Sequence, residues 1–336
     1  MSIQLRFLLT IFTLLPLASC VTPSTQASNE LGQPHIQTPT FDATHFIAQD
    51  GYKLPFKSWP AAEKPERIIL ALHGFNDYSN AFTGLCEFMK ANQSTKMLCI
   101  AYDQRGFGAT EQTGIWPQQG KLQSDLMTMS KSLKQQYPNT ELYIVGESMG
   151  GAVIISALTQ NNEKTSHIDG IILLAPAVWA RSTQPWYQRF ALFVAVHTFP
   201  GWKPTGESLG VVATDNREAL IAMSQDPLVI KETRIDAIYG LTNLMDLALE
   251  NASAMQTPTL VLYGLKDEVI PKAPTCEMLK RMESHQVNHQ LKLYANGYHM
   301  LSRDLQAQRV FKDMTAWMDD PNGFESSSIK ELNCGQ

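Results

Sequence analysis

The chain has 336 residues, of which 44% are hydrophobic, and its formal net charge is −5 at pH 7. This length and apolar content are sufficient for one large hydrophobic core. The sequence contains no run of basic residues, so it lacks the positive surface that a nucleic-acid backbone requires, and nucleic acid is excluded as a partner.

The first 19 residues have the pattern of an export signal. Arg6 provides a positive start, residues 7–17 are mostly apolar, and Leu17-Ala18-Ser19-Cys20 resembles a bacterial lipobox. We therefore expect Cys20 to become the lipid-modified first residue of the mature protein. An ordinary secretory signal or a short membrane anchor is the alternative. A membrane-spanning helix needs about 20 apolar residues, however, and this run is shorter and contains two threonines.

The residue after Cys20 and the segment that follows predict where the protein is attached. Val21 is not the aspartate that retains lipoproteins at the inner membrane in enterobacterial-type sorting. The predicted location is therefore the bacterial cell envelope, at the outer membrane and facing the periplasm, with Cys20 as the anchor. Residues 20–40 are rich in Pro, Ser, Thr and Gln, which is typical of a flexible tether.

Residues 41–320 show the alternation of short apolar runs and helical patterns that predicts an α/β domain with a mostly parallel central sheet flanked by helices. A hairpin at residues 45–47 and 54–59 is expected to open the sheet. The predicted buried strands are 67–72, 97–102, 141–145, 170–174, 259–263 and 290–294. The predicted helices are 121–136, 150–160, 273–282 and 305–318.

Residues 181–256 interrupt this alternation and are interpreted as a helical cap inserted over the carboxyl edge of the sheet. The aromatic residues in and just before this segment could either line an acyl-binding cleft or hold the cap onto the core. They are Trp179, Trp186, Tyr187, Phe190, Phe193, Phe199 and Trp202. Residues 321–336 are expected to form a surface tail.

Four cysteines follow Cys20, and in an exported protein an even number permits disulfides. Cys86 could pair with Cys99, and Cys276 could pair with Cys334. Four unpaired thiols are the alternative, because connectivity cannot be deduced from a sequence.

The pentapeptide Gly146-Glu147-Ser148-Met149-Gly150 fits the G-x-S-x-G nucleophile elbow, a sharp turn between a strand and a helix. The pattern alone is weak evidence, but here it follows a predicted strand and opens a predicted helix, as the elbow requires. Ser148 is therefore the predicted nucleophile. A serine hydroxyl needs a base to take its proton, and in this arrangement an acid and then a histidine follow the serine along the chain.

Asp267 and His299 are the predicted acid and base, because each follows a strand that ends at the carboxyl edge of the sheet. Glu268 is the competing acid. His285 and His289 are rival bases, but both precede their strand and are expected at the opposite edge. Two backbone N–H groups must also receive the oxyanion, and we assign them to Met149 and Phe75.

Two further segments are expected to support this site. Phe75 lies in His73-Gly74-Phe75-Asn76-Asp77, directly after the strand 67–72, and His73 is interpreted as the residue that organises this loop. The segment Asp103 to Gly108 follows the next strand and contains two glycines. We interpret it as a turn that supports the oxyanion loop.

Together these motifs resemble the monoacylglycerol lipase and lysophospholipase branch of the α/β-hydrolases, which is sometimes grouped with serine aminopeptidases. The resemblance covers residues 50–319 and includes Asp226-Pro227-Leu228-Val229 in the cap. It implies an α/β-hydrolase fold with a helical cap and a serine ester hydrolase acting on monoacylglycerols, lysophospholipids or other mono-acyl esters. The lipobox, the tether and the extra cysteines depart from the best-known members.

Two other functions remain open at this point. A peptidase that releases N-terminal residues would need an acidic amine-binding patch, for which Glu207, Asp215 and Glu218 are available. A non-catalytic envelope lipoprotein that binds lipid is the second alternative. Dehalogenases and epoxide hydrolases are disfavoured because they place aspartate where Ser148 stands. The interpretation as an ester hydrolase requires no cofactor, no metal and no obligate protein partner.

Overall fold

The computed structural model describes residues 22–26, 37–61, 63–91, 96–159, 165–205 and 210–334. The predicted signal peptide, Cys20 and most of the predicted tether therefore lie outside the described residues. Within the described ranges, no helix is both long enough and apolar enough to cross a membrane.

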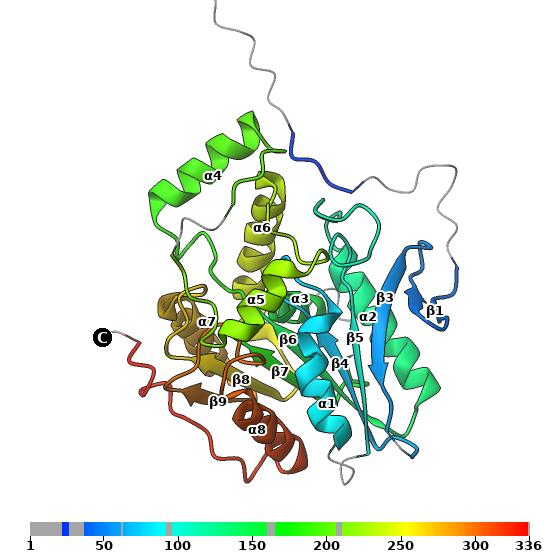
Figure 1. The fold of residues 1–336 in the computed structure, drawn as a ribbon. Helices are drawn as coiled ribbons and strands as arrows, with labels where there is room; N and C mark the ends of the chain where they lie inside the picture. The colour runs from blue at the N-terminus through cyan, green and yellow to red at the C-terminus, as the bar shows by residue number, and fades with distance from the viewer. Residues whose placement is uncertain are drawn as a thin grey trace, which may run out of the picture.

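A nine-stranded sheet forms the centre of the molecule (Figure 1). Its strand order is β1-β2-β3-β5-β4-β6-β7-β8-β9. Neighbouring strands from β5 to β9 in this order are parallel, whereas the pairs β1–β2, β2–β3 and β3–β5 are antiparallel. The strands are β1 (Thr40–Phe41), β2 (His45–Ile47), β3 (Lys53–Trp59), β4 (Arg67–Leu72), β5 (Met97–Tyr102), β6 (Glu141–Glu147), β7 (Gly170–Leu174), β8 (Thr259–Gly264) and β9 (His289–Tyr294).

The predicted strands and the opening hairpin are confirmed, with shifts of one or two residues at some ends. The largest shift is in β6, which continues to Glu147 because Gly146 and Glu147 still pair with Leu173 and Leu174 of β7. The two-residue strand β1, which pairs with β2, was not predicted from the sequence.

Helices cover both faces of the sheet, and the alternation of side chains along β4 shows how. Ile68, Leu70 and Leu72 belong to the core beneath α2, α3, α6 and α7, whereas Ile69 and Ala71 belong to the core beneath α1 and α8. Strands buried on both faces read as continuous apolar runs. The helices are α1 (Thr83–Ala91), α2 (Lys121–Gln136), α3 (Met149–Leu158), α4 (Trp186–Thr198), α5 (Arg217–Gln225), α6 (Ile235–Asn251), α7 (Lys272–Ser284) and α8 (Ala307–Asp319), with short 3₁₀ turns at Ser79–Phe82 and Ala252–Ala254.

Three helices, α4, α5 and α6, connect β7 to β8, in agreement with the helical texture of residues 181–256. Of these three helices, α6 packs into the core. Met245, Ala248 and Leu249 of α6 are buried in the same core as residues of α3. In contrast, Val196 is the only buried residue of α4, and α5 has none.

Both suggested cysteine pairs are disulfides in the structure. Cys86 of α1 is bonded to Cys99 of β5, and Cys276 of α7 is bonded to Cys334. The segment after Pro321 is mostly exposed, as expected for a surface tail, but it is fastened to the domain. Besides the disulfide, Leu332 is buried and the Ser327 N–H donates to the carbonyl of Leu291 in β9.

This topology is that of the α/β-hydrolase fold. The chain order reverses around β4, which has β5 on one side and β6 on the other. In open α/β sheets, ligands bind outside the carboxyl ends of the strands at such a reversal point. The loops that follow β4 and β6 meet here, and they carry Phe75 and Ser148.

Candidate active site

Ser148 occupies a strained turn between β6 and α3, as predicted. Its φ of 53° and ψ of −113° lie outside the regions that most residues adopt. Neighbouring backbone holds this conformation, because the Ser148 N–H donates to the carbonyl of Leu174 and the Ser148 carbonyl accepts from Ala177. Such strain persists only where the surrounding structure holds it. In a nucleophile elbow this conformation exposes the serine side chain at the carboxyl edge of the sheet.

The glycines of the elbow are required by close packing. A Cβ at Gly150 would overlap the carbonyl of Leu72, and a Cβ at Gly151 would lie 2.8 Å from Cβ of Pro176. Both glycines therefore allow α3 to approach the ends of the neighbouring strands closely. This approach fixes the start of the helix, and with it the position of Ser148.

Asp267 and His299 are joined by a hydrogen bond of 2.8 Å between Oδ2 and Nδ1, and both side chains are buried. The other carboxylate oxygen, Oδ1, accepts from the N–H groups of Val269 and Ile270 at 2.8 and 2.9 Å. These backbone donors fix the carboxylate with Oδ2 toward the imidazole. A carboxylate at Nδ1 selects the tautomer whose Nε2 is free to accept a proton.

The rival residues lie elsewhere. Glu268 is exposed, and it accepts a hydrogen bond from the N–H of Val212. His285 is exposed at the end of α7, and His289 begins β9 at the opposite edge of the sheet from Ser148. The geometry therefore joins the predicted acid Asp267 to the predicted base His299, and His299 lines the same cavity as Ser148.

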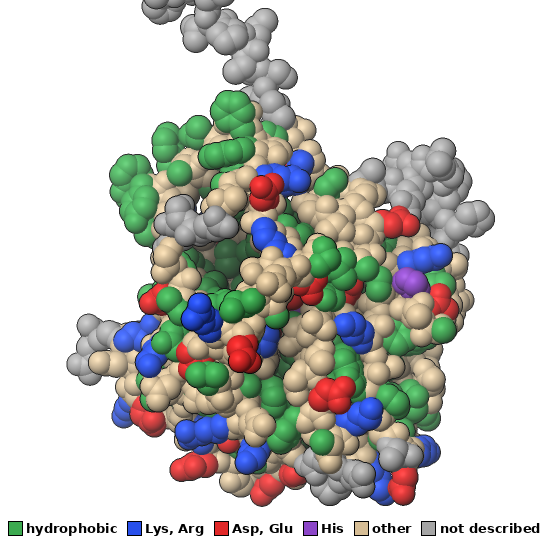
Figure 2. Space-filling model, viewed as in Figure 1, with side chains coloured by type: hydrophobic (Ala, Val, Ile, Leu, Met, Phe, Trp, Pro, Cys, Tyr) green, Lys and Arg blue, Asp and Glu red, His purple; other side chains and the backbone are tan. Residues whose placement is uncertain are grey.

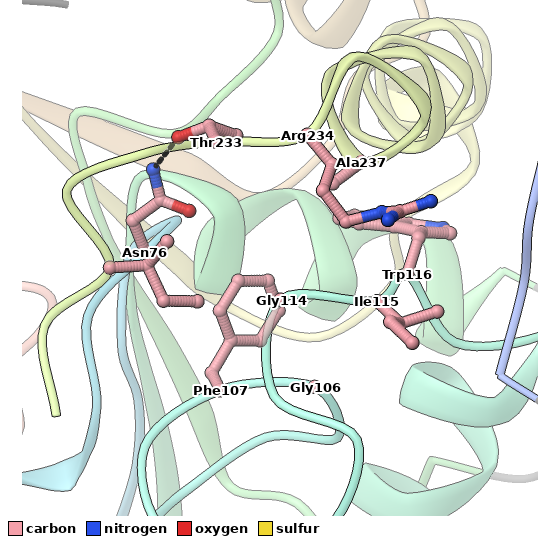
Figure 3. Close-up of a pocket in the computed structure, with 10 residues that line it drawn as sticks. Asn76, Gly106, Phe107, Gly114, Ile115, Trp116, Thr233, Arg234 and Ala237 are labelled. Atoms are coloured by element: carbon pink, nitrogen blue, oxygen red, sulfur yellow. Dashed lines mark hydrogen bonds between the residues drawn. The ribbon is translucent and has the colours of Figure 1, made fainter. Parts of the chain in front are cut away.

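The two predicted oxyanion donors, Met149 and Phe75, come from the start of α3 and from the loop after β4. Met149 is the first residue of α3, so its N–H has no partner within the helix. Phe75 lines the same cavity as Ser148 and His299. The next residue, Asn76, has a φ of 65° and is held by the segment before α6, because its Nδ2 donates to Thr233 Oγ1 at 2.5 Å (Figure 3).

His73 organises this loop, as the sequence suggested. It is fully buried, its Nδ1 is 2.8 Å from the carbonyl oxygen of Gly74, and its Nε2 accepts from the N–H of Gln104. Burial lowers the pKa of His73, which favours the neutral imidazole that can both donate and accept here. His73 therefore has a structural role that needs no contact with substrate.

The turn from Asp103 to Gly108 supports the same loop. Asp103 accepts from the N–H of Ser79 through Oδ1 and from the N–H of Ala109 through Oδ2. Phe107 packs edge to face against Phe75, with ring centroids 5.7 Å apart. The predicted supporting role of this segment is consistent with these contacts.

An ion cluster built on two buried carboxylates connects three parts of the site, and no sequence motif predicted it. Arg303 donates to Asp77 in the oxyanion loop at 2.6 Å and to Glu147, the residue before Ser148, at 3.0 Å. Ser302 Oγ donates to the other oxygen of Glu147 at 2.8 Å. The loop that carries His299 is thereby tied to the loops that carry Phe75 and Ser148.

Asp304 follows Arg303 and stabilises the turn before His299. It accepts from the N–H of Tyr298 and from the hydroxyl of Thr214, both at 2.7 Å. Burial raises the pKa of Asp304 to about 6, and the hydrogen bonds from Thr214 and Tyr298 oppose this rise. The aspartate is therefore a second carboxylate that orders the histidine loop.

A cavity of about 340 Å³ opens onto Ser148 and His299. Its walls are predominantly apolar and come from the cap, the oxyanion loop and the segment after Asp267. The apolar lining residues are Phe75, Ala177, Trp179, Ala213, Met223, Val229, Ile230, Leu241, Met245, Val269, Ile270 and Met300. The acidic residues among the lining, Asp77 and Glu147, are both paired with Arg303.

Most of the aromatic residues proposed for the cleft do not line it. Trp179 does, but the other six are 56 to 70% exposed and point away from the core. The sequence could not show whether these side chains line a cleft or hold the cap onto the core, because clefts and cores use the same residue types. Exposure of these aromatic side chains was a third possibility that we did not predict. Within the described residues, no group of three His, Cys, Asp or Glu side chains is placed to hold a metal ion.

Comparison with known proteins agrees with this fold. Monoglyceride lipase of Rattus norvegicus is 24% identical over 289 residues, covering 83% of this chain and 91% of the relative. Monoacylglycerol lipase of Mycolicibacterium smegmatis is 23% identical, covering 81% and 95%. A crystal structure of a soluble variant of monoglyceride lipase from Saccharomyces cerevisiae has a TM-score of 0.65 at 18% identity, covering 91% and 100%.

The family comparison covers the larger part of the chain. Residues 63–306 match the family model described as "Serine aminopeptidase, S33". This range begins just before β4 and ends after the loop of His299, so it contains Ser148, Asp267 and His299 together with the cap. The chain belongs to the serine aminopeptidase S33 family of α/β-hydrolases.

Proposed function

We propose that this protein is a serine ester hydrolase that cleaves mono-acyl lipids such as monoacylglycerols or lysophospholipids. One observation carries the proposal: Ser148, on a strained elbow, and His299, hydrogen-bonded to Asp267, face one apolar cavity of about 340 Å³. Apolar clefts of about 300 to 1,000 Å³ with a few polar groups are typical of small-molecule sites. The names of the curated relatives support the same substrate class.

The reaction follows from the roles of these atoms. Ser148 Oγ attacks the ester carbonyl carbon while His299 Nε2 takes the hydroxyl proton. The N–H groups of Phe75 and Met149 receive the oxyanion of the tetrahedral intermediate. His299 then gives its proton to the oxygen of the departing alcohol, which leaves an acyl-enzyme. Water, deprotonated by His299, releases the fatty acid and restores Ser148.

The lining of the cavity favours an acyl ester over a peptide with a free amino terminus. A peptidase of that kind needs an unpaired carboxylate near the nucleophile to bind the amine. Asp77 and Glu147 are both already paired with Arg303, and Asp215 accepts from the N–H of Leu305. Glu218 is exposed on α5, and Glu207 lies outside the described residues.

Hydrolysis of monoacylglycerols by the purified chain tests this proposal, with aminoacyl amides as the competing substrates. We expect turnover of the acyl esters, and a loss of about 10,000-fold or more in kcat for Ser148→Ala. Asp267→Asn should also lower kcat strongly, by about 10,000-fold, because an amide no longer selects the required tautomer of His299. Glu268→Gln, which changes the exposed neighbour, is the matched control and should retain activity.

Two outcomes would overturn the proposal. Preferential cleavage of aminoacyl amides would assign the chain to peptidases instead. A folded chain that hydrolyses none of these substrates, and whose Ser148 is not labelled by a fluorophosphonate probe, would support a lipid-binding role without catalysis.

We further propose that the protein is anchored in the bacterial envelope through lipid on Cys20, at the outer membrane and facing the periplasm. The lipobox-like sequence Leu17-Ala18-Ser19-Cys20 supports this, and two disulfides suit an oxidising compartment. Mass spectrometry of the amino-terminal peptide should find acyl groups on Cys20. An unmodified Cys20 in protein isolated from membranes would contradict the proposal.

A further inference from the structure

The segment that joins α5 to α6 bonds the cap to the oxyanion loop. We call residues 226–234 the α5–α6 connection, and it begins with Asp226-Pro227-Leu228-Val229. None of the proposed catalytic residues and oxyanion donors lies in this connection. Its contacts with the oxyanion loop therefore need a separate explanation.

Asp226 attaches the start of the connection to the residue that follows the oxyanion loop. Its Oδ2 accepts a hydrogen bond of 2.6 Å from the hydroxyl of Tyr78, while its Oδ1 accepts from the N–H of Leu228 at 2.9 Å. The second bond fixes the carboxylate with Oδ2 toward the tyrosine. Burial raises the pKa of Tyr78, and the bond to Asp226 raises it further, so the hydroxyl keeps its proton and remains the donor.

Asn76 of the oxyanion loop receives two further contacts from the connection. Its backbone carbonyl accepts from the N–H of Ile230 at 2.9 Å, and its Nδ2 donates to Thr233 Oγ1 (Figure 3). Asn76 has a φ of 65°, a left-handed conformation that most residues avoid. Because Asn76 directly follows Phe75, the contacts that hold this conformation also position the predicted oxyanion donor.

The same connection forms part of the cavity wall. Val229 and Ile230 line the cavity together with Ser148, and so does Met223 of the preceding helix α5. In the space-filling view the surface is hollowed between α4 and α5, with hydrophobic side chains at the bottom of the hollow (Figure 2). Ile230 therefore borders the space for an acyl chain and, through its backbone N–H, also holds Asn76.

This double role of the connection links acyl binding to catalysis. An acyl chain that fills the cavity packs against Val229 and Ile230 and favours the position of the connection that holds Asn76. A short acyl chain does not reach this wall and leaves the oxyanion loop without this support. Binding energy from a part of the substrate that is remote from the reacting bond then raises kcat as well as lowering KM.

We propose that the α5–α6 connection transmits occupancy of the acyl cavity to the oxyanion loop, with Asp226, Tyr78 and Thr233 as positioning residues. The inference rests on the ester hydrolysis proposed above and adds a source of chain-length selectivity to it. None of these three residues lines the cavity, so they act through the oxyanion loop and not on the acyl chain. An ester with a long acyl chain is accordingly hydrolysed with a higher kcat than an ester with a short one.

Steady-state hydrolysis of p-nitrophenyl butanoate and decanoate by the purified chain tests this proposal. Both acylation and deacylation pass through an oxyanion, and the acyl chain stays in the cavity until deacylation, so kcat reports on the loop in either step. We expect kcat of the wild-type chain to be about 10-fold higher for decanoate than for butanoate. In Tyr78→Phe/Thr233→Val, which removes both side-chain contacts, this ratio should fall to about 1, while KM for decanoate stays within about twofold of the wild-type value.

Conservative and matched variants serve as controls. Thr233→Ser keeps the accepting hydroxyl and should retain the wild-type ratio. Tyr187→Phe/Thr198→Val makes the same two chemical changes on α4, where both residues are exposed and Thr198 Oγ1 donates to carbonyls of its own helix. This variant should also retain the ratio. Asp226 is partly exposed, so water can solvate its carboxylate after Tyr78→Phe, and thermal unfolding should show a folded protein.

Several results would overturn the proposal. It is wrong if the wild-type kcat does not depend on acyl length, or if the double variant keeps the wild-type ratio, including an equal loss of kcat for both esters. A change confined to KM for decanoate would assign the connection to acyl binding alone. Failure of the proposed ester hydrolysis is a separate result, because the wild-type chain would then cleave neither ester and a fluorophosphonate probe would not label Ser148.

Discussion

Arg303 Nη2 donates a hydrogen bond of 3.0 Å to Oε2 of Glu147, the residue that immediately precedes Ser148. The same guanidinium pairs with Asp77, so two buried carboxylates share one partly buried cation. Removal of one partner from a buried pair is more costly than the pair itself is stabilising, because the remaining charges lose their compensation. Arg303 is thus a positioning residue that acts through the loops of His299, Ser148 and Phe75.

We expect Arg303→Met to lower the free energy of unfolding by about 3 to 5 kcal/mol, because Asp77 and Glu147 would be left as unpaired buried carboxylates. The catalytic efficiency kcat/KM should fall as well, since the three loops lose their common contact. Urea unfolding and ester hydrolysis measure the two effects. Glu147→Gln keeps one oxygen that can accept from Arg303, and its NH2 group can donate to the hydroxyl of Ser302, so it is the milder control. A stable and fully active Arg303→Met protein would show that Arg303 does not position these three loops.

The pairing of Arg303 with Glu147 and Asp77 could not be predicted from the sequence, although the three proposed catalytic residues could. Ser148 was found because its neighbours form a local motif, and Asp267 and His299 because each follows a recognisable apolar strand. Glu147 occupies the unspecified position of the G-x-S-x-G pattern, and its partner is 156 residues away in the chain. A local motif or a periodicity cannot predict the pairing of Glu147 with Arg303. The pair forms only because the fold brings the end of β6 and the loop after β9 to the same edge of the sheet.

The cap shows a different limit. The α/β architecture was predictable because the core strands are buried on both faces and appear as uninterrupted apolar runs. Helix α4 is apolar around most of its circumference, and such a helix is normally buried in a core or in a membrane. Its sequence therefore suggested burial or contact with substrate, whereas the structure leaves Phe190 and Phe193 exposed. The amino-acid composition indicates that these side chains favour an apolar environment. It does not indicate what provides that environment.

The disulfides should contribute unequally to stability. In the chain-entropy model a disulfide restricts the unfolded state more strongly as the loop it closes becomes longer. The separation is 13 residues for Cys86–Cys99 and 58 for Cys276–Cys334. We expect the paired change to serine to cost about 3 kcal/mol for the first and about 4 kcal/mol for the second. Thermal unfolding of the two double variants without reductant measures the difference, and a reversed order would show that strain or residual structure outweighs loop length.

Asp304 should give the stability of the protein a distinct pH dependence. Burial raises its pKa to about 6, above the value of about 3.9 expected in the unfolded chain. Between these values the folded state binds a proton that the unfolded state has released, so the contribution of Asp304 is present below about pH 4 and is lost as the pH rises through 6. Asp304→Asn cannot ionise and should show a smaller decrease in unfolding free energy over this interval. Equal slopes for both proteins in urea titrations would contradict this assignment.

The apolar cavity should determine the length of the acyl chain that the enzyme accepts. Leu241 of α6 lines the cavity, and a larger side chain at this position would occupy space that the substrate needs. We expect Leu241→Trp to lower kcat/KM for long acyl esters by about 10-fold or more, with short esters little affected, because one or two methylene groups in an apolar pocket change kcat/KM by about this factor. Glu250→Trp, an exposed position on the same helix outside the cavity, is the matched control. A uniform loss over all chain lengths would indicate that Leu241 supports the cap, and that the acyl chain lies elsewhere.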